Sequence, residues 1–165
     1  MSFVTAKPNA DGTRGAWTGD AGETTNLYAK VIDASDSTYI KTSTGSDSVF
    51  LLLDNMPADF DKITAITVSV RGKRNSNKGD YINFSSARIY KSDESTALTA
   101  ASTFSFSTTV ADYSEALALT GSLDKTSWDG ARIKLTSDGG SSSSINVYEV
   151  SVAITYQVPV FLIMF

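Results

Sequence analysis

A period of two runs through Val147-Tyr148-Glu149-Val150-Ser151-Val152-Ala153-Ile154-Thr155-Tyr156, where large apolar residues alternate with small or polar ones. Successive side chains of a β-strand point to opposite faces of the sheet, so this alternation predicts a long strand with one buried face. The even-numbered residues from Tyr148 to Tyr156 are expected on the buried face. The odd-numbered residues from Glu149 to Thr155 are expected on the other face.

The same alternation recurs in shorter segments toward the N-terminus. Residues 66–70, 103–107 and 132–136 each carry apolar side chains at every second position. Residues 81–90 are rich in β-branched and aromatic side chains but alternate less regularly, which predicts a strand with a bulge or bend near residues 85–86. Each of these segments is a predicted strand.

Turn signals separate the predicted strands. Residues 75–80 (NSNKGD) are typical of a hairpin tip, and residues 137–144 (SDGGSSSS) are typical of a polar loop. Residues 50–53 are continuously apolar, as in a strand covered on both faces. Residues 111–119 are compatible with one or two helical turns or with another short strand. Strands therefore recur about every ten residues, which is the spacing of sandwiches and barrels.

This pattern predicts an antiparallel β-sandwich, jelly-roll-like, with about eight to ten strands. A chain of 165 residues is expected to form one domain with a single core. No linker or repeat divides it. We therefore predict one domain over residues 1–157, followed by an apolar C-terminal segment over residues 158–165.

The composition excludes several classes of chemistry. The chain has no histidine and no cysteine, which removes Ser-His-Asp and Cys-His catalysis, disulfides, and zinc or iron–sulfur sites of the usual kind. Its 14 basic and 18 acidic residues argue against nucleic acid as the main partner. No apolar run is long enough to span a membrane, and the N-terminus lacks a signal-peptide pattern. We expect no cofactor and no membrane partner.

Two sets of carboxylates are candidate sites. The first is scattered along the early turns and could supply oxygen ligands for calcium, but it lacks a calcium-loop pattern. It comprises Asp11, Asp20, Glu23, Asp33 and Asp36. The second consists of the close pairs 59/61 and 93/94, which could serve glycoside hydrolysis only at a fixed separation. Both sets are better interpreted as solvated turn residues, so no metal and no catalytic residue is predicted.

One basic cluster and several aromatic residues remain as candidate contacts. Arg71, Lys73, Arg74 and Lys78 could bind an acidic protein surface, or could simply keep strand edges soluble. Exposed tyrosines could stack against sugars, whereas large aromatic residues more often fill the core. The tyrosines expected to be most exposed, and hence candidate glycan contacts, are Tyr81 and Tyr113.

The C-terminal segment is the least ordinary part of the sequence. Apart from Pro159 it is entirely large and apolar, and chain ends usually lie at the surface. It could form a last strand of the same sandwich, be buried against a partner or second copy, or be merely tolerated. We favour an interface, formed by Val158, Val160, Phe161, Leu162, Ile163, Met164 and Phe165.

A family resemblance extends from Trp17 to Tyr156. The segments that carry it are 26–33 (NLYAKVID), 36–42 (DSTYIKT), 63–73 (ITAITVSVRGK), 127–128 (SW), 131–135 (ARIKL) and 147–156. Together they resemble β-sandwich virion proteins of tailed bacteriophages, which include capsid decoration (cement) proteins and fibre proteins. Ala34 follows Asp33 where such domains often carry an acidic residue, so no site residue is taken from the resemblance.

The resemblance implies a non-enzymatic virion structural protein, most simply a cement protein on the outer capsid surface. Such a protein would be made in the host cytoplasm, form a homo-oligomer, expected to be a trimer, and contact the major capsid protein. The alternative is a fibre or adhesin domain that binds host-surface glycan. A glycan depolymerase is the third reading, and no acid–base pair in the sequence supports it.

Overall fold

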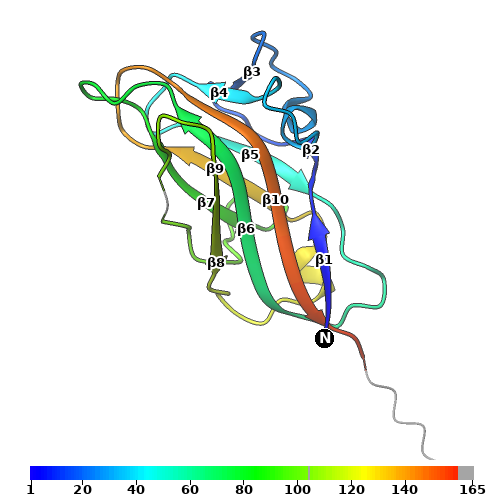
Figure 1. The fold of residues 1–165 in the computed structure, drawn as a ribbon. Helices are drawn as coiled ribbons and strands as arrows, with labels where there is room; N and C mark the ends of the chain where they lie inside the picture. The colour runs from blue at the N-terminus through cyan, green and yellow to red at the C-terminus, as the bar shows by residue number, and fades with distance from the viewer. Residues whose placement is uncertain (104, 160–165) are drawn as a thin grey trace, which may run out of the picture.

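The computed structural model describes residues 1–103 and 105–159, which form two packed β-sheets (Figure 1). The strands are β1 (Ser2–Ala6), β2 (Pro8–Asp11), β3 (Thr18–Gly19), β4 (Ile40–Thr42), β5 (Ser48–Leu53), β6 (Lys62–Arg74), β7 (Phe84–Tyr90), β8 (Ala111–Leu117), β9 (Arg132–Ser137) and β10 (Ile145–Gln157). A 3-10 turn, η1 (Leu27–Val31), and one short helix, α1 (Lys125–Trp128), lie between them.

Sheet A has the strand order β3-β4-β10-β6-β8, and β1 pairs with the C-terminal half of β10. Sheet B has the order β2-β5-β9-β7. All pairs of named strands are antiparallel, and buried residues of both sheets form one core cluster. The predicted antiparallel β-sandwich is confirmed, with ten strands among the described residues. Sheet A faces the viewer in Figure 1.

Strand β10 lies at the centre of sheet A, as its alternating sequence suggests. Val150, Val152 and Ile154 are fully buried and stand opposite apolar residues of β6. The alternation breaks at Tyr148, where the β10–β6 register shifts between Val147 and Glu149. Tyr148 is buried outside the core cluster, with its ring edge-on to Tyr39 at 5.3 Å between centroids.

Other segments resolve or correct the sequence-based expectations. The predicted irregularity near residues 85–86 is confirmed as a register shift between Phe84 and Ser86 in the β7–β9 pair. Residues 111–117 form strand β8, not a helix. The strand predicted over 103–107 is wrong for its described residues, which belong to no strand. Phe106 is nevertheless fully buried, because its ring stacks on Phe84 at 4.6 Å.

The close approach of Phe106 to strand β6 requires a glycine. A Cβ at Gly72 would lie 2.2 Å from the Phe106 ring, well inside contact distance. Phe106 cannot retreat easily, because Phe84 packs on it. Overpacking of this kind destabilises a core by about 1–3 kcal/mol.

We therefore expect Gly72→Ala to lower the free energy of unfolding by about 1–3 kcal/mol in denaturant melts. Gly121→Ala is the matched control, because nothing lies within 4 Å of the Cβ it would add. Equal midpoints for the two variants would contradict the packing described here.

Candidate functional site

A shallow hollow of about 260 Å³ lies on the outer face of sheet A. Three adjacent strands line it in two rows. Ser69 of β6 stands opposite Ser114 of β8 and Ser151 of β10. Two positions away, Arg71 stands opposite Asp112 on one side and Glu149 on the other. We call this site the serine hollow; Val70 and Tyr113 complete its lining.

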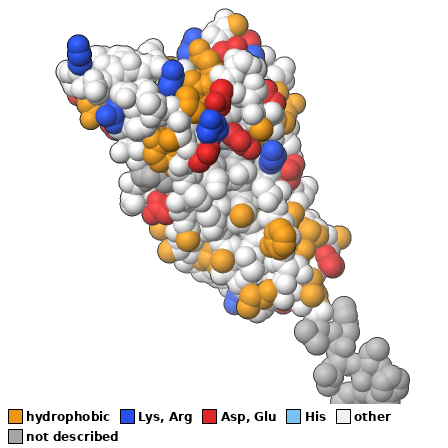
Figure 2. All heavy atoms as spheres, in the orientation of Figure 1, with side chains coloured by type: hydrophobic (Ala, Val, Ile, Leu, Met, Phe, Trp, Pro, Cys, Tyr) orange, Lys and Arg blue, Asp and Glu red, His pale blue; other side chains and the backbone are white. Residues whose placement is uncertain are grey.

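The hollow exists because of side-chain length. The three serines are short, whereas the neighbouring arginine, aspartate and glutamate reach further from the sheet. The Oγ atoms of Ser69 and Ser114 lie 3.1 Å apart and share a hydrogen bond. Figure 2 shows that side chains of both charges gather over the upper half of this face. A small, polar depression therefore lies beside a charged border.

Arg71 is held in a fixed orientation by two carboxylates. Its Nε and Nη2 donate to the two oxygens of Asp36, at 2.7 and 2.8 Å. Its Nη1 donates to both oxygens of Asp112, at 3.1 and 3.2 Å. The hydrogen bonds from Arg71 hold the pKa of Asp36 below its usual range, and those to Asp36 and Asp112 raise the pKa of Arg71. The guanidinium is thus locked in its charged form.

Glu149 completes the charged row from the other side. Its Oε1 lies 3.8 Å from Nζ of Lys7, at the outer limit of an ion pair. The border of the hollow thus holds two cations, Arg71 and Lys7, against the carboxylates of Asp36, Asp112 and Glu149. Hydroxyl groups that both donate and accept lie beside charged groups of both signs, an arrangement suited to a polyhydroxylated ligand.

Of the two predicted glycan tyrosines, Tyr113 belongs to the lining of the serine hollow and Tyr81 does not. Tyr113 points inward from β8, where its ring packs against Phe106 at 5.0 Å and its hydroxyl accepts a hydrogen bond from the Ser107 backbone. Tyr81 lies beneath Arg74, whose guanidinium carbon is 4.5 Å from the ring centroid. Both residues are half-buried, and their role as glycan contacts stays a prediction.

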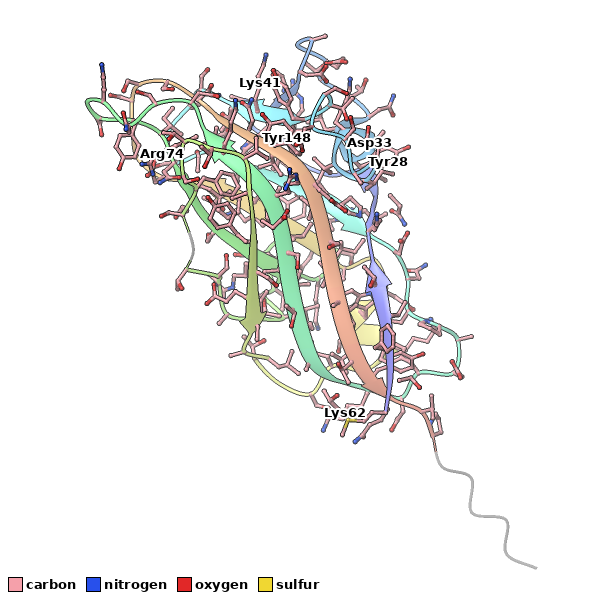
Figure 3. All side chains as sticks on the ribbon, in the orientation of Figure 1. Tyr28, Asp33, Lys41, Lys62, Arg74 and Tyr148 are labelled. Atoms are coloured by element: carbon pink, nitrogen blue, oxygen red, sulfur yellow. The ribbon has the colours of Figure 1, made fainter. Side chains whose placement is uncertain are left out.

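The four basic residues have different surroundings. Arg71 lies among carboxylates, and Arg74 donates to the Phe106 carbonyl at 2.6 Å while covering Tyr81 (Figure 3). Lys73 is half-buried and Lys78 is exposed in the loop after β6. The structure pairs neither lysine with a carboxylate among the residues it describes.

The scattered carboxylates serve local structure. Asp11 accepts backbone hydrogen bonds from Leu27 and Tyr28, and Asp33 accepts from Ser35 and Thr38. Asp20 and Glu23 both pair with Lys30. Within residues 1–103 and 105–159, no group of three or more acidic side chains is arranged to hold a metal ion.

The proposed interface at the C-terminus falls mostly outside the described residues. Val160, Phe161, Leu162, Ile163, Met164 and Phe165 all lie there. Val158 is described and is 38% exposed. No helix among the described residues is long and apolar enough to cross a membrane.

Sequence analysis missed the serine hollow, although a signal for it exists. Each of three strands carries a charged residue two positions from a serine, in the segments 69–71 (SVR), 112–114 (DYS) and 149–151 (EVS). Spacing of two puts both side chains on one face of each strand. Only the strand register brings the three segments into line.

Comparison with known proteins finds likeness in structure alone. No protein-family model and no curated protein matches the chain. Nineteen chains of solved structures do match. An arabinose-bound GH51 α-L-arabinofuranosidase gives a TM-score of 0.50 at 13% identity, covering 89% of this chain. The match covers 27% of the enzyme chain, so the present chain spans about a quarter of that enzyme's length.

Two further neighbours are of different kinds. A CBM4 protein gives a TM-score of 0.48 at 12% identity, covering 86% of this chain and 95% of its own. The enzymatically active domain of tailspike protein 4 of bacteriophage CBA120 gives 0.47 at 11% identity, covering 93% of this chain and 19% of its own. At such low identity, the match to the arabinofuranosidase shows a shared β-sandwich fold alone.

Replacing Arg71 by methionine tests the electrostatics of the hollow. We expect the pKa of Asp36 to rise to its ordinary value, near 4, or above it, because the hydrogen bonds that lower it are lost. Carboxyl ¹³C NMR titration measures this directly. Asp93 is the control, because Thr96 and Ser95 lower its pKa and Arg71 plays no part.

We also expect Arg71→Met to change how the free energy of unfolding depends on pH in the acid range. A carboxyl whose pKa is lower in the folded state stabilises the fold above its unfolded pKa and loses that effect as the pH falls through the folded value. The wild type should therefore lose the Asp36–Arg71 contribution below about pH 4, and Arg71→Met should lack it at all pH values. If Asp36 had the same pKa in the wild type and in Arg71→Met, the hydrogen bonds described between Arg71 and Asp36 would be contradicted.

Proposed function

We propose that this chain is a non-enzymatic carbohydrate-binding β-sandwich that takes part of a glycan at the serine hollow. The alignment of Ser114, Ser69 and Ser151 beside Asp112, Arg71 and Glu149 supports this most strongly. It corresponds to the adhesin alternative expected from the sequence, with serines and charged residues in place of the tyrosines as the main contacts.

The chemistry of the hollow suits sugar hydroxyls. Each serine offers one donor and two acceptor positions, and each carboxylate accepts from neighbouring hydroxyls. Arg71 is already oriented by Asp36, so its remaining polar contacts cost little reorganisation. A volume of about 260 Å³ has room for one or two sugar rings, below the usual range for drug-sized ligands.

The expected affinity is weak. The hollow lacks a stacking platform, because the ring of Tyr113 faces Phe106. Hydrogen bonds contribute only about 1 kcal/mol each, and the cost of association offsets part of their sum, so a Kd of about 1 mM or weaker is expected. Weak single sites of this kind become effective when several copies act together on one glycan.

We expect Ser69→Ala/Ser114→Ala to weaken binding of a glycan identified on an array of host-surface saccharides. Losing two hydroxyls costs about 1–3 kcal/mol, which raises the Kd roughly 5- to 150-fold. Isothermal titration measures the change. Ser86→Ala/Thr136→Ala is the matched control, because this pair of facing hydroxyl residues lies on sheet B.

The two outcomes separate clearly. Loss of binding in the sheet A pair alone supports the hollow. Loss in the sheet B pair alone, or no binding of any saccharide by the wild type, refutes the assignment.

A second candidate function is self-association on a virion surface, as expected of a cement protein. Met1 and Phe3 are 93% and 83% exposed, and Val158 is 38% exposed. They lie at one end of sheet A, because β1 runs beside the end of β10 and Met1 lines a hollow with Val158. The apolar residues 160–165 follow directly in sequence. Apolar groups at one exposed end favour burial against a second copy.

Light scattering of the full chain and of a chain ending at Gln157 tests this candidate. We expect a defined oligomer, with a trimer as the first guess, for the full chain and a folded monomer for the shortened one. Phe3→Ser in the full chain should weaken the assembly. Folded monomers in all three samples would rule out self-association through this end.

A further inference from the structure

The outer face of sheet B carries a second ordered array of side chains. Its strands place Lys134 of β9 opposite Phe50 of β5 and Arg88 of β7. Two positions along the strands on the same face, Arg132 of β9 stands opposite Tyr90 of β7. Three cations and two aromatic rings therefore share one face of these three strands. We call these five residues the cationic face.

The aromatic rings hold the cations in place. Lys134 Nζ lies 5.4 Å from the Phe50 centroid and 5.8 Å from the Tyr90 centroid. The guanidinium carbon of Arg88 lies 5.5 Å from the Tyr90 centroid. Phe50 and Tyr90 meet edge-on at 5.5 Å. Cations at these distances are attracted to the rings, so their charged ends are pre-positioned.

The positive charge of this face is only partly balanced. Glu94 pairs with Arg132, and the pKa of Glu94 is lowered because hydrogen bonds from Thr13 and Arg132 outweigh the effect of its partial burial. Nε of Arg132 is still buried without a hydrogen-bond partner. Neither Arg88 nor Lys134 is paired with a carboxylate among the described residues, although Arg88 Nε donates to the Thr99 carbonyl.

Two features distinguish this arrangement from a merely soluble surface. Arg88 and Lys134 stand directly opposite each other, and like charges at facing positions destabilise a sheet. The excess is also positive in a chain whose net charge is −4. A bound anion would relieve the repulsion and use donors that are already oriented.

We propose that the cationic face binds an acidic saccharide, with its carboxylate or sulfate between Arg88 and Lys134. Two facing cations, held in place by aromatic rings, fit a saccharide that carries a charged group. The site lies on the opposite sheet from the serine hollow, so it stands or falls independently of the proposed function there.

The test titrates the full chain with a tetragalacturonate and with a sulfated tetrasaccharide by calorimetry and by amide NMR. Arg88→Met/Lys134→Met removes the charges and keeps similar apolar stems. We expect this variant to bind at least one probe roughly 10- to 100-fold more weakly than the wild type. A neutral maltotetraose should bind equally to both proteins at this face.

The control is Lys62→Met/Lys78→Met, which lowers the net charge equally at sites away from this face; Lys62 is labelled in Figure 3 at the far end of sheet A. It should change the Kd less than twofold. Amide shifts in the wild type should concentrate on β7 and β9, a result that does not depend on how any variant folds.

Several results would overturn the proposal. The first is amide shifts confined to β6, β8 and β10. The second is an equal loss of probe affinity in both double variants. The third is no binding of either acidic probe at about 10 mM salt, where screening is weak. Equal binding of a tetrathymidylate would also overturn it, because the face would then be a general polyanion surface.

Discussion

The pairing of β10 with β6 is the constraint on which the rest of the molecule depends. It places Val150, Val152 and Ile154 in the core and, by alternation, Glu149 and Ser151 on the outer face. Because the side-chain period is two, a slip of one residue would exchange these sets and expose the core. The same register therefore carries both stability and the composition of the outer face. A shift in the register of β10 would therefore disrupt the core and the serine hollow together.

The fold was accessible from the sequence because its strands alternate so regularly. The alternation over residues 147–156 predicts a strand directly. The bulge near residues 85–86 was predicted from a break in the alternation. The strand predicted around Phe106 was wrong. Its neighbours alternate as in a strand, but its burial comes from stacking on Phe84. Such a contact between distant segments leaves no local periodicity.

The candidate site was not accessible in the same way. A serine two positions from a charge is unremarkable in any one strand, and only the register of β8, β6 and β10 assembles the rows. The surroundings of the two tyrosines also depend on contacts that local sequence does not show. Tyr113 faces inward because it stands one position from Asp112 and Ser114, and Tyr81 is covered by Arg74 from the preceding strand. The two faces also differ in character, one rich in hydroxyls and carboxylates, the other in cations and aromatic rings.

The central claim is that strand register builds a sugar-binding surface from residues that are unremarkable alone. An amide NMR map of the full chain with a mixture of neutral host-surface oligosaccharides tests it most directly. The account predicts shifts that concentrate on residues 69–71, 112–114 and 149–151, one short segment in each of three strands. Shifts confined to the loops at 75–80 and 137–144, or no shifts at all at tens of millimolar saccharide, would contradict it.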